Sequence, residues 1–277
     1  MAAALAIEHV GAAGVVTSRT ISWKAPVSVS SSRGIRALVA VLALAVAHDA
    51  RAQRNTGDGF LFREPQGSFS IRGGYSGANA SSDLFSFTTN ELTLNKSSFS
   101  GATVGADFSF RLAPQFDLSL AADYAGVSPK SEFRRLVDQN NLPIEQVTDY
   151  RRVPLVASVR AYLTPRGRSI GHFVYIPSKF TPWIEGGGGV TWFQFRQHGD
   201  FVDFKDNSVF TATNEAEGWA PTANGAVGAD ISLSARFALT GAARYVYGKG
   251  NLSGDFTGFD KIDLSGVFTT VGLTVRF

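Results

Sequence analysis

The sequence predicts a closed, antiparallel, up-and-down β-barrel of about eight strands that crosses a membrane. Short segments alternate between apolar and polar residues, and no apolar run reaches the roughly 18 residues that a membrane-spanning helix needs. A segment typical of a secretory signal precedes the first strand. Glycine and phenylalanine number 29 and 22 of 277 residues, a composition that suits many turns and many half-exposed strands.

Composition excludes several kinds of site. The chain has no cysteine, so thiolate metal sites, disulfides, cysteine nucleophiles and a lipid-modified N-terminal cysteine are excluded. The formal net charge of +3 comes from the first 52 residues, because the remainder holds 21 basic and 21 acidic residues. The charge therefore gives no reason to expect nucleic acid as a partner.

A leader is expected before the barrel. Two arginines precede an apolar stretch at 37–47, and Ala50-Arg51-Ala52 has small residues at both ends. This order is typical of a signal peptide, so we place the signal at about 33–52, with cleavage between Ala52 and Gln53. A short core helix is the alternative. The expected organisation is a leader at 1–52, a short periplasmic segment at 53–65 and the barrel at 66–277.

Eight segments are predicted to be strands. Val104–Phe110 alternates most clearly, with apolar residues at even positions, and Phe116–Tyr124 repeats the pattern. A similar pair at 228–233 and 237–245 indicates a meander built by repeating one unit. Long and short connections alternate, although the one at 164–180 is longer than a turn. The predicted strands are Ser68–Ser76, Ser100–Arg111, Phe116–Gly126, Tyr150–Leu163, Thr181–Arg196, Trp219–Leu233, Phe237–Gly248 and Asp263–Phe277.

The two faces of these strands differ in charge. In seven strands the apolar phase, which includes Leu118, Val159 and Val271, holds no charged residue. A membrane barrel turns this phase to lipid and its polar phase to the lumen, whereas a soluble, lipocalin-like barrel does the reverse. The signal, the small residues of the polar phase and the aromatic residues at strand ends favour the membrane arrangement. Thr181–Arg196 has no clean phase, and we assign Glu185 inward because a charge facing lipid is costly.

The charged residues of the polar phase are predicted to fill the lumen. An eight-stranded barrel is just wide enough for side chains to fill, and lone buried charges are costly, so opposite charges should pair. We interpret them as a plug, and a narrow or gated pore is the alternative. The predicted lumen residues are Arg72, Asp107, Asp117, Asp123, Arg160, Glu185, Asp230, Arg244 and Arg276.

No catalytic residue, cofactor or metal site is predicted. His198, with Asp200 or Asp203, could serve a lipid A hydrolase or acyltransferase, but no nucleophile motif accompanies it, and a solvated loop histidine is the simpler interpretation. Arginines flanking an outer loop could bind lipopolysaccharide phosphates, because the guanidinium fork matches phosphate geometry, or could form a solvated rim. These arginines are Arg134, Arg135, Arg151 and Arg152.

The end of the chain resembles a known family. The last strand ends in Thr-Val-Gly-Leu-Thr-Val-Arg-Phe, an alternating segment that closes on Phe277. It resembles the signal that the insertion machinery of the bacterial outer membrane recognises, and residues 66–277 resemble the OmpA/OmpX-type small-barrel superfamily. The resemblance implies an outer-membrane protein in contact with lipid, including lipopolysaccharide, and brings no active site. We expect a structural or surface-interaction role, with any extracellular ligand at outer loops near 77–99, 127–149, 197–218 and 249–262.

Overall fold

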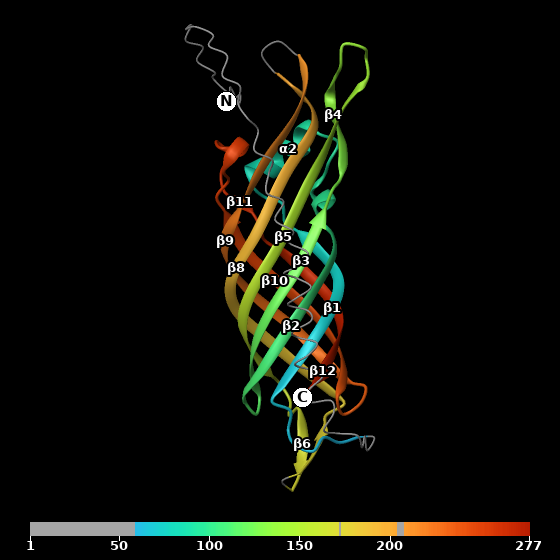
Figure 1. Cartoon of the computed structure of the whole chain (residues 1–277), viewed down its shortest axis with the longest axis vertical. Coiled ribbons are helices and arrows are strands. Elements are labelled where there is room, and N and C mark those ends of the chain that lie inside the picture. The colour runs from blue at the N-terminus through green and yellow to red at the C-terminus, as the bar shows by residue number, and fades with distance from the viewer. Residues whose placement is uncertain (1–58, 172, 204–207) are drawn as a thin grey trace, which may run out of the picture. The chain divides into compact units, whose positions relative to one another are not determined.

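The computed structural model describes residues 59–171, 173–203 and 208–277, which Figure 1 shows as a barrel with long hairpins at one end. The expected leader at 1–52 and its cleavage site lie outside the described residues. Within the described ranges, no helix is long and apolar enough to cross a membrane.

Eight strands of the described region close into a ring. Each pairs antiparallel with its neighbours in the order β1-β2-β3-β5-β8-β9-β10-β12, and β12 pairs with β1. All eight predicted strands are present in the predicted order, so the fold class is confirmed. Closure pairs both edges of the sheet, which is the condition for a β-structure surrounded by hydrocarbon. The ring strands are β1 (Gly67–Ala78), β2 (Gly101–Ala113), β3 (Phe116–Val127), β5 (Pro143–Tyr162), β8 (Phe180–Val202), β9 (Val209–Ser232), β10 (Phe237–Gly250) and β12 (Gly266–Arg276).

The two ends of the barrel differ. At the end that we call the turn end, short connections join β2 to β3 and β9 to β10, and the final residue Phe277 lies there too. The connection at 163–179, which looked too long for a turn, contains a hairpin of β6 (Gly167–Ile170) and β7 (Val174–Pro177). The opposite, loop end carries the remaining elements. These are α2 (Asp83–Glu91), η1 (Lys96–Phe99), β4 (Lys130–Val137), η2 (Gly254–Phe256) and β11 (Ile262–Asp263).

The apolar phase faces outward and the charged phase inward, as predicted. Val159 and Val271 are 48% and 58% exposed, whereas Asp107 and Arg244 are 2% and 4% exposed. The strand without a clean phase, β8, follows the same rule, because Glu185 is buried inside and Ile184 is exposed outside. The barrel therefore has the polarity that lipid on the outside and a polar lumen require.

The strand register shows where the apolar outer surface ends on the side of the loop end. Val153, Trp192 and Trp219 lie side by side on β5, β8 and β9, and the next outward-facing row is Arg151, Gln194 and Glu217. On β5, ten residue steps separate Val153 from Leu163 at the turn end, or about 33 Å of strand. A tilt of about 40° reduces this to an apolar height of about 25 Å, the thickness of an outer-membrane barrel's lipid-facing band.

Above this row the barrel has an apolar core of its own, which we call the outer cap. Helix α2 and the connection between β10 and β12 contribute buried side chains that pack against inward-facing residues of β5 and β8. Four rings of the cap contact one another edge to face, with centroids 4.7–6.3 Å apart. Two of the four expected outer loops are thus folded into a core. The main members of the outer cap are Leu84, Phe85, Phe99, Tyr150, Phe193, Phe195, Phe256, Ile262 and Leu264.

Candidate functional site: the charged lumen

Three arginines and three carboxylates alternate around a closed ring inside the barrel. Arg72 donates from Nε and Nη2 to the two oxygens of Asp123, both at 2.9 Å, and its Nη1 lies 3.6 Å from Asp107. Such a bidentate contact is the strongest geometry for an arginine–carboxylate pair. Asp107 belongs to β2 and Asp123 to β3, so this half of the ring joins three adjacent strands.

The other half of the ring crosses the lumen. Arg160 Nη2 lies 3.2 Å from Asp107 and 2.8 Å from Glu185. Arg244 then donates from Nη1 to Asp123 and from Nη2 to Glu185, each at 3.0 Å, which closes the ring. Every carboxylate therefore contacts two arginines, and the formal charges sum to zero. We call the six side chains the ion ring: Arg72, Asp107, Arg160, Glu185, Arg244 and Asp123.

Local sequence makes room for the ion ring. Gly105 lies beside Asp123 in the register, and a Cβ built on it would come within 2.0 Å of the Asp123 carboxylate. Gly272 lies beside Arg72, and a Cβ there would lie 2.8 Å from that residue's Cβ. Glycine on the lumen face therefore allows long charged side chains to cross a narrow barrel.

Neutral groups support the ion ring and leave little space around it. Ser119 donates to Asp107 at 2.5 Å, and the Trp183 ring lies 4.1 Å from the Arg160 guanidinium carbon. All six charged side chains are at most 9% exposed. The cavity beside them measures about 10 Å³, which is close to the least that holds one water molecule.

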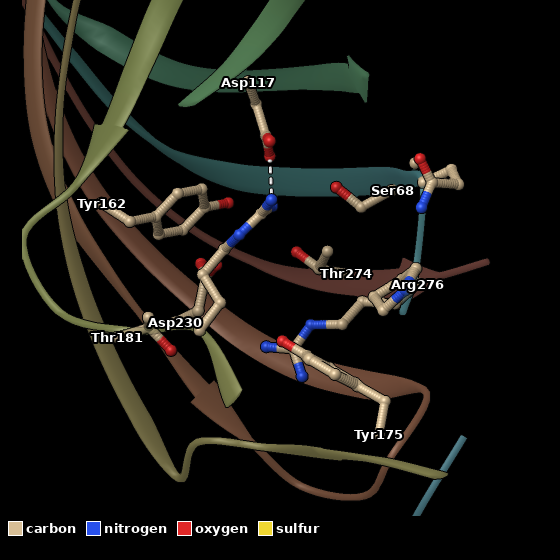
Figure 2. Close-up of a pocket in the computed structure, with 12 residues that line it drawn as sticks. Ser68, Asp117, Tyr162, Tyr175, Thr181, Asp230, Thr274 and Arg276 are labelled. Atoms are coloured by element: carbon tan, nitrogen blue, oxygen red, sulfur yellow. Dashed lines mark hydrogen bonds and ion pairs between the residues drawn. The ribbon is translucent and has the colours of Figure 1, made fainter. Parts of the chain in front are cut away.

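The other three predicted lumen residues lie nearer the turn end and outside the ion ring. Asp117 pairs with Arg166 at 2.8 Å, Asp230 accepts from Thr240 at 2.8 Å, and Arg276 donates to Ser232 at 2.8 Å. Figure 2 shows Asp117, Asp230 and Arg276 around a cavity of about 30 Å³ at the mouth. Sequence reasoning missed Arg166, because it lies on a connection and no strand phase points it inward.

The interpretation of Arg152 as a lipopolysaccharide contact needs correction. Arg152 is 2% exposed and donates inward to the Leu264 carbonyl at 2.9 Å and to Ser76 Oγ at 2.7 Å. The rings of Tyr150 and Phe268 lie 5.3 and 5.4 Å from its guanidinium carbon. The sequence itself indicates that Arg152 faces inward, because residues 152 and 160 share a strand phase.

The neighbouring arginines stay at the surface. Arg151 faces outward and donates to Gln194 at 3.1 Å. Arg134 is exposed and donates to the carbonyl of Leu94 at 2.9 Å, where it helps to hold the connection that follows α2. Arg135 is exposed as well. These three remain accessible to a phosphate group.

The outer cap has its own acidic latch. Asp263 accepts from Ser81 Oγ at 2.6 Å, from Ser81 N at 3.2 Å and from Ser265 N at 3.0 Å, which ties two loops together. Burial favours the neutral acid, but these hydrogen bonds outweigh it and hold the pKa of Asp263 below its usual value. The latch is thus built around an ionised carboxylate.

Among the described contacts, those of His198 do not form a catalytic arrangement. Asp149 lies 3.8 Å from its Nδ1, and Asp200 accepts instead from Thr211 at 2.7 Å. Ser128 donates to the other side of Asp149 at 2.5 Å, so the carboxylate lies between hydroxyl and imidazole. A nucleophilic serine needs the imidazole next to it instead. Across the described residues, no three metal-ligating side chains come together.

Ring closure, an apolar outer face and a buried charged lumen define a small β-barrel of the outer-membrane type. No family model and no curated protein matches the chain. Solved structures with a similar fold are small outer-membrane barrels. The N-terminal β-barrel domain of Pseudomonas aeruginosa OprF is 10% identical, with a TM-score of 0.35, and the match covers 77% of this chain and 100% of that one.

Two further solved structures are similar to this chain. Neisserial surface protein A is 15% identical, with a TM-score of 0.38, and the match covers 80% of this chain and 100% of that one. Ail of Yersinia pestis, solved with the heparin analogue sucrose octasulfate, is 10% identical, with a TM-score of 0.36 and coverage of 76% and 99%. The class assigned above rests on the closure and polarity of this barrel.

Proposed function

We propose that this protein is an integral outer-membrane barrel with a structural or surface-interaction role and a lumen closed to solutes. The observation that carries the proposal is that charged and apolar side chains pack inside the barrel at two levels. The ion ring lies within the apolar band, with its side chains at most 9% exposed, and the buried residues of the outer cap lie above it. A passive pore would require both levels to open.

Opening the lumen is energetically costly. A solute path past the ion ring would separate arginines from carboxylates inside a barrel, and breaking one buried pair typically costs 3–5 kcal/mol. A path through the outer cap would also expose Phe85, Phe195 and Phe256, which are at most 5% exposed. The charged lumen therefore acts as a brace between strands. The narrow pore remains the second candidate, supported only by the polar character of the lumen.

Surface interaction would reside on the hairpins that extend beyond the apolar band. The β8–β9 pair continues in register to Val202 and Val209, and β4 pairs with β5 beside it. Large apolar side chains at these hairpins are exposed, among them Val137, Leu142 and Phe210. Exposed Arg134 and Arg135, together with half-buried Arg151, would meet lipopolysaccharide phosphates at the same end.

Insertion would depend on the last strand. Phe277 exchanges backbone hydrogen bonds with Gly67 at 3.0 Å, and its ring lies 5.7 Å from that of Phe108. The terminal aromatic residue thus lies at the junction that closes the barrel. We propose that the outer-membrane insertion machinery recognises this strand.

Two measurements test the proposal. Unboiled protein from outer membranes should migrate faster on a denaturing gel than boiled protein, because the closed barrel resists unfolding. Purified protein in planar bilayers should show no discrete conductance steps. Stable steps would support the pore instead, and protein found only in soluble fractions would reject membrane insertion.

A rim enzyme is the least supported alternative. Mass spectrometry of lipid A from cells that express the wild-type protein or His198→Ala should give identical spectra. A modification that depends on His198 would overturn the assignment of a non-enzymatic role.

A further inference from the structure

Charge is distributed unequally between the two ends of the barrel. The described strand ends and connections of the turn end lie at 59–67, 111–116, 163–171, 173–180, 232–237 and 276–277, and they hold seven basic residues and one acidic residue. The described loop-end segments hold thirteen acidic and nine basic residues, at 79–100, 128–152, 193–203, 208–218 and 249–265. We call the seven basic residues of the turn end the basic rim.

The basic rim lies at the edge of the lipid-facing surface. Lys179 precedes Phe180, Arg236 precedes Phe237 and Arg276 precedes Phe277, and these three phenylalanines are 42–57% exposed. Phe110 and Arg111 repeat the pair at the end of β2. Four of the eight strand ends here thus place an exposed aromatic ring next to a cation, as expected where hydrocarbon gives way to headgroups.

Part of the basic rim is contiguous across neighbouring strand ends. Ser232 N donates to the Lys179 carbonyl at 2.9 Å, and Ser232 Oγ accepts from Arg276 at 2.8 Å. Arg276 N donates in turn to the Arg236 carbonyl at 2.8 Å. The backbones of three cationic residues from three connected segments therefore lie together at one edge of the barrel, and the Arg276 side chain turns towards the mouth of the lumen.

Few acidic side chains offset the basic rim. Arg111 pairs with Glu64 at 2.6 Å, and Arg166 pairs with Asp117 at 2.8 Å. Arg63, Arg168 and Lys179 are exposed, and none of the three has a carboxylate within 4.0 Å in the described region.

The β6–β7 hairpin extends this surface beyond the barrel mouth (Figure 1). Arg168 lies on it together with Ile170 and Phe173, which are 54% and 66% exposed. The backbone of Tyr175 on the same hairpin pairs with that of Leu61, which brings the segment containing Arg63 alongside. Cations and exposed apolar side chains are therefore combined here too.

We propose that the basic rim binds the phosphate groups of anionic phospholipids in the membrane leaflet at the turn end. The proposal rests on the membrane insertion proposed above and adds the chemical class of lipid that the barrel selects. Arginine and lysine recognise phosphate oxygens, and the adjacent phenylalanines fit the upper acyl region. The excess of cations predicts a preference for anionic over zwitterionic headgroups.

The test is lipid retention by the folded, full-length protein in neutral detergent, measured by native mass spectrometry. The probes are phosphatidylglycerol and phosphatidylcholine with identical acyl chains. The rim variant combines Arg63→Gln, Arg168→Gln and Lys179→Gln, and none of these residues belongs to the ion ring or the outer cap. The matched control removes three exposed cations from the loop end through Lys96→Gln, Lys130→Gln and Lys261→Gln.

Each cation near an anionic surface is worth about a fivefold change in affinity, so the rim variant should lose at least about tenfold of the preference for phosphatidylglycerol. The loop-end variant should keep the preference. An equal loss in both variants, or no preference in the wild type, would overturn the proposal. So would displacement of phosphatidylglycerol by millimolar inorganic phosphate, because that would indicate a site for free anions.

A separate arm keeps the two proposals distinguishable. Wild type and both variants are refolded into phosphatidylcholine vesicles and checked by the gel shift between unboiled and boiled samples. Insertion there without a preference for phosphatidylglycerol rejects only the lipid selectivity. Failure of the wild type to insert rejects the proposal that this protein is an integral membrane protein.

Discussion

Replacing Arg160 by methionine should open the ion ring and destabilise the barrel strongly. The change removes the contacts at 3.2 Å to Asp107 and at 2.8 Å to Glu185, and it also removes the cation over Trp183. Among its ion pairs Asp107 then keeps only the one with Arg72, at 3.6 Å, and the ion ring gains a net negative charge. Removing one partner of a buried ion pair costs about 3–5 kcal/mol, which lowers the folded-to-unfolded ratio about a hundredfold or more.

A double variant separates charge balance from packing. Arg160→Met with Glu185→Gln leaves two arginines and two carboxylates, and the new amide can still accept from Arg244. We expect it to recover at least about 1 kcal/mol of the loss, although it changes more atoms. Arg276→Met, which removes a single hydrogen bond to Ser232, is the matched control and should cost about 1 kcal/mol.

The assay is urea-induced unfolding in lipid vesicles, followed by the fraction of protein that keeps its fast-migrating gel band. A free energy of unfolding for Arg160→Met within about 1 kcal/mol of the wild type would refute the ion ring as a brace. If the double variant loses as much free energy of unfolding as the single variants Arg160→Met and Glu185→Gln lose together, charge balance is not the cause of the destabilisation.

Three further perturbations test other parts of the molecule. Gly189→Val should prevent refolding, because a Cβ there lies 2.0 Å from the Leu155 carbonyl, whereas Gly186→Val, where nothing lies within 4 Å, should refold normally; the gel shift reports both. Phe85→Ala should destabilise the outer cap by about 3–5 kcal/mol and make the loop at 79–100 sensitive to protease, while the ring strands stay resistant. The ionised Asp263 should stabilise the outer cap at pH values above its ordinary pKa of 3.8, and this stabilisation should disappear as the pH falls through the lower pKa of the folded protein. The protection factors of the cap amides in hydrogen exchange should show that loss in the wild type and little dependence on pH in Asp263→Asn.

The strands and their orientation could be predicted because lipid imposes a strict rule on sequence. A period of two with no charge on one phase is a local pattern, readable without knowing any contact. The assignment of Glu185 to the interior follows from the same rule and agrees with its burial in β8. The rule does not apply to residues on connections, so it did not predict that Arg166 pairs with Asp117.

The pairing within the lumen could not be predicted in the same way. Contacts such as Arg244 with Asp123 and Glu185 depend on register, strand tilt and barrel width together, and none of these is encoded in alternation alone. The outer cap was missed for another reason. Leu84 and Phe85 lie in a short helix between strands, and an apolar pair in a connection carries no periodic signal of burial.

The junction of β1 with β12 brings together residues far apart in the chain. The hydroxyls of Ser70 and Thr274 lie 2.8 Å apart although 204 residues separate them. During synthesis, the outward-facing apolar residues of every earlier strand therefore exist before the sheet can close, and the protein must be kept from aggregating until β12 emerges. A chain that stops before Gly266 would leave the edges of β1 and β10 unpaired. We therefore expect cells to degrade it, rather than to accumulate a barrel with one strand fewer.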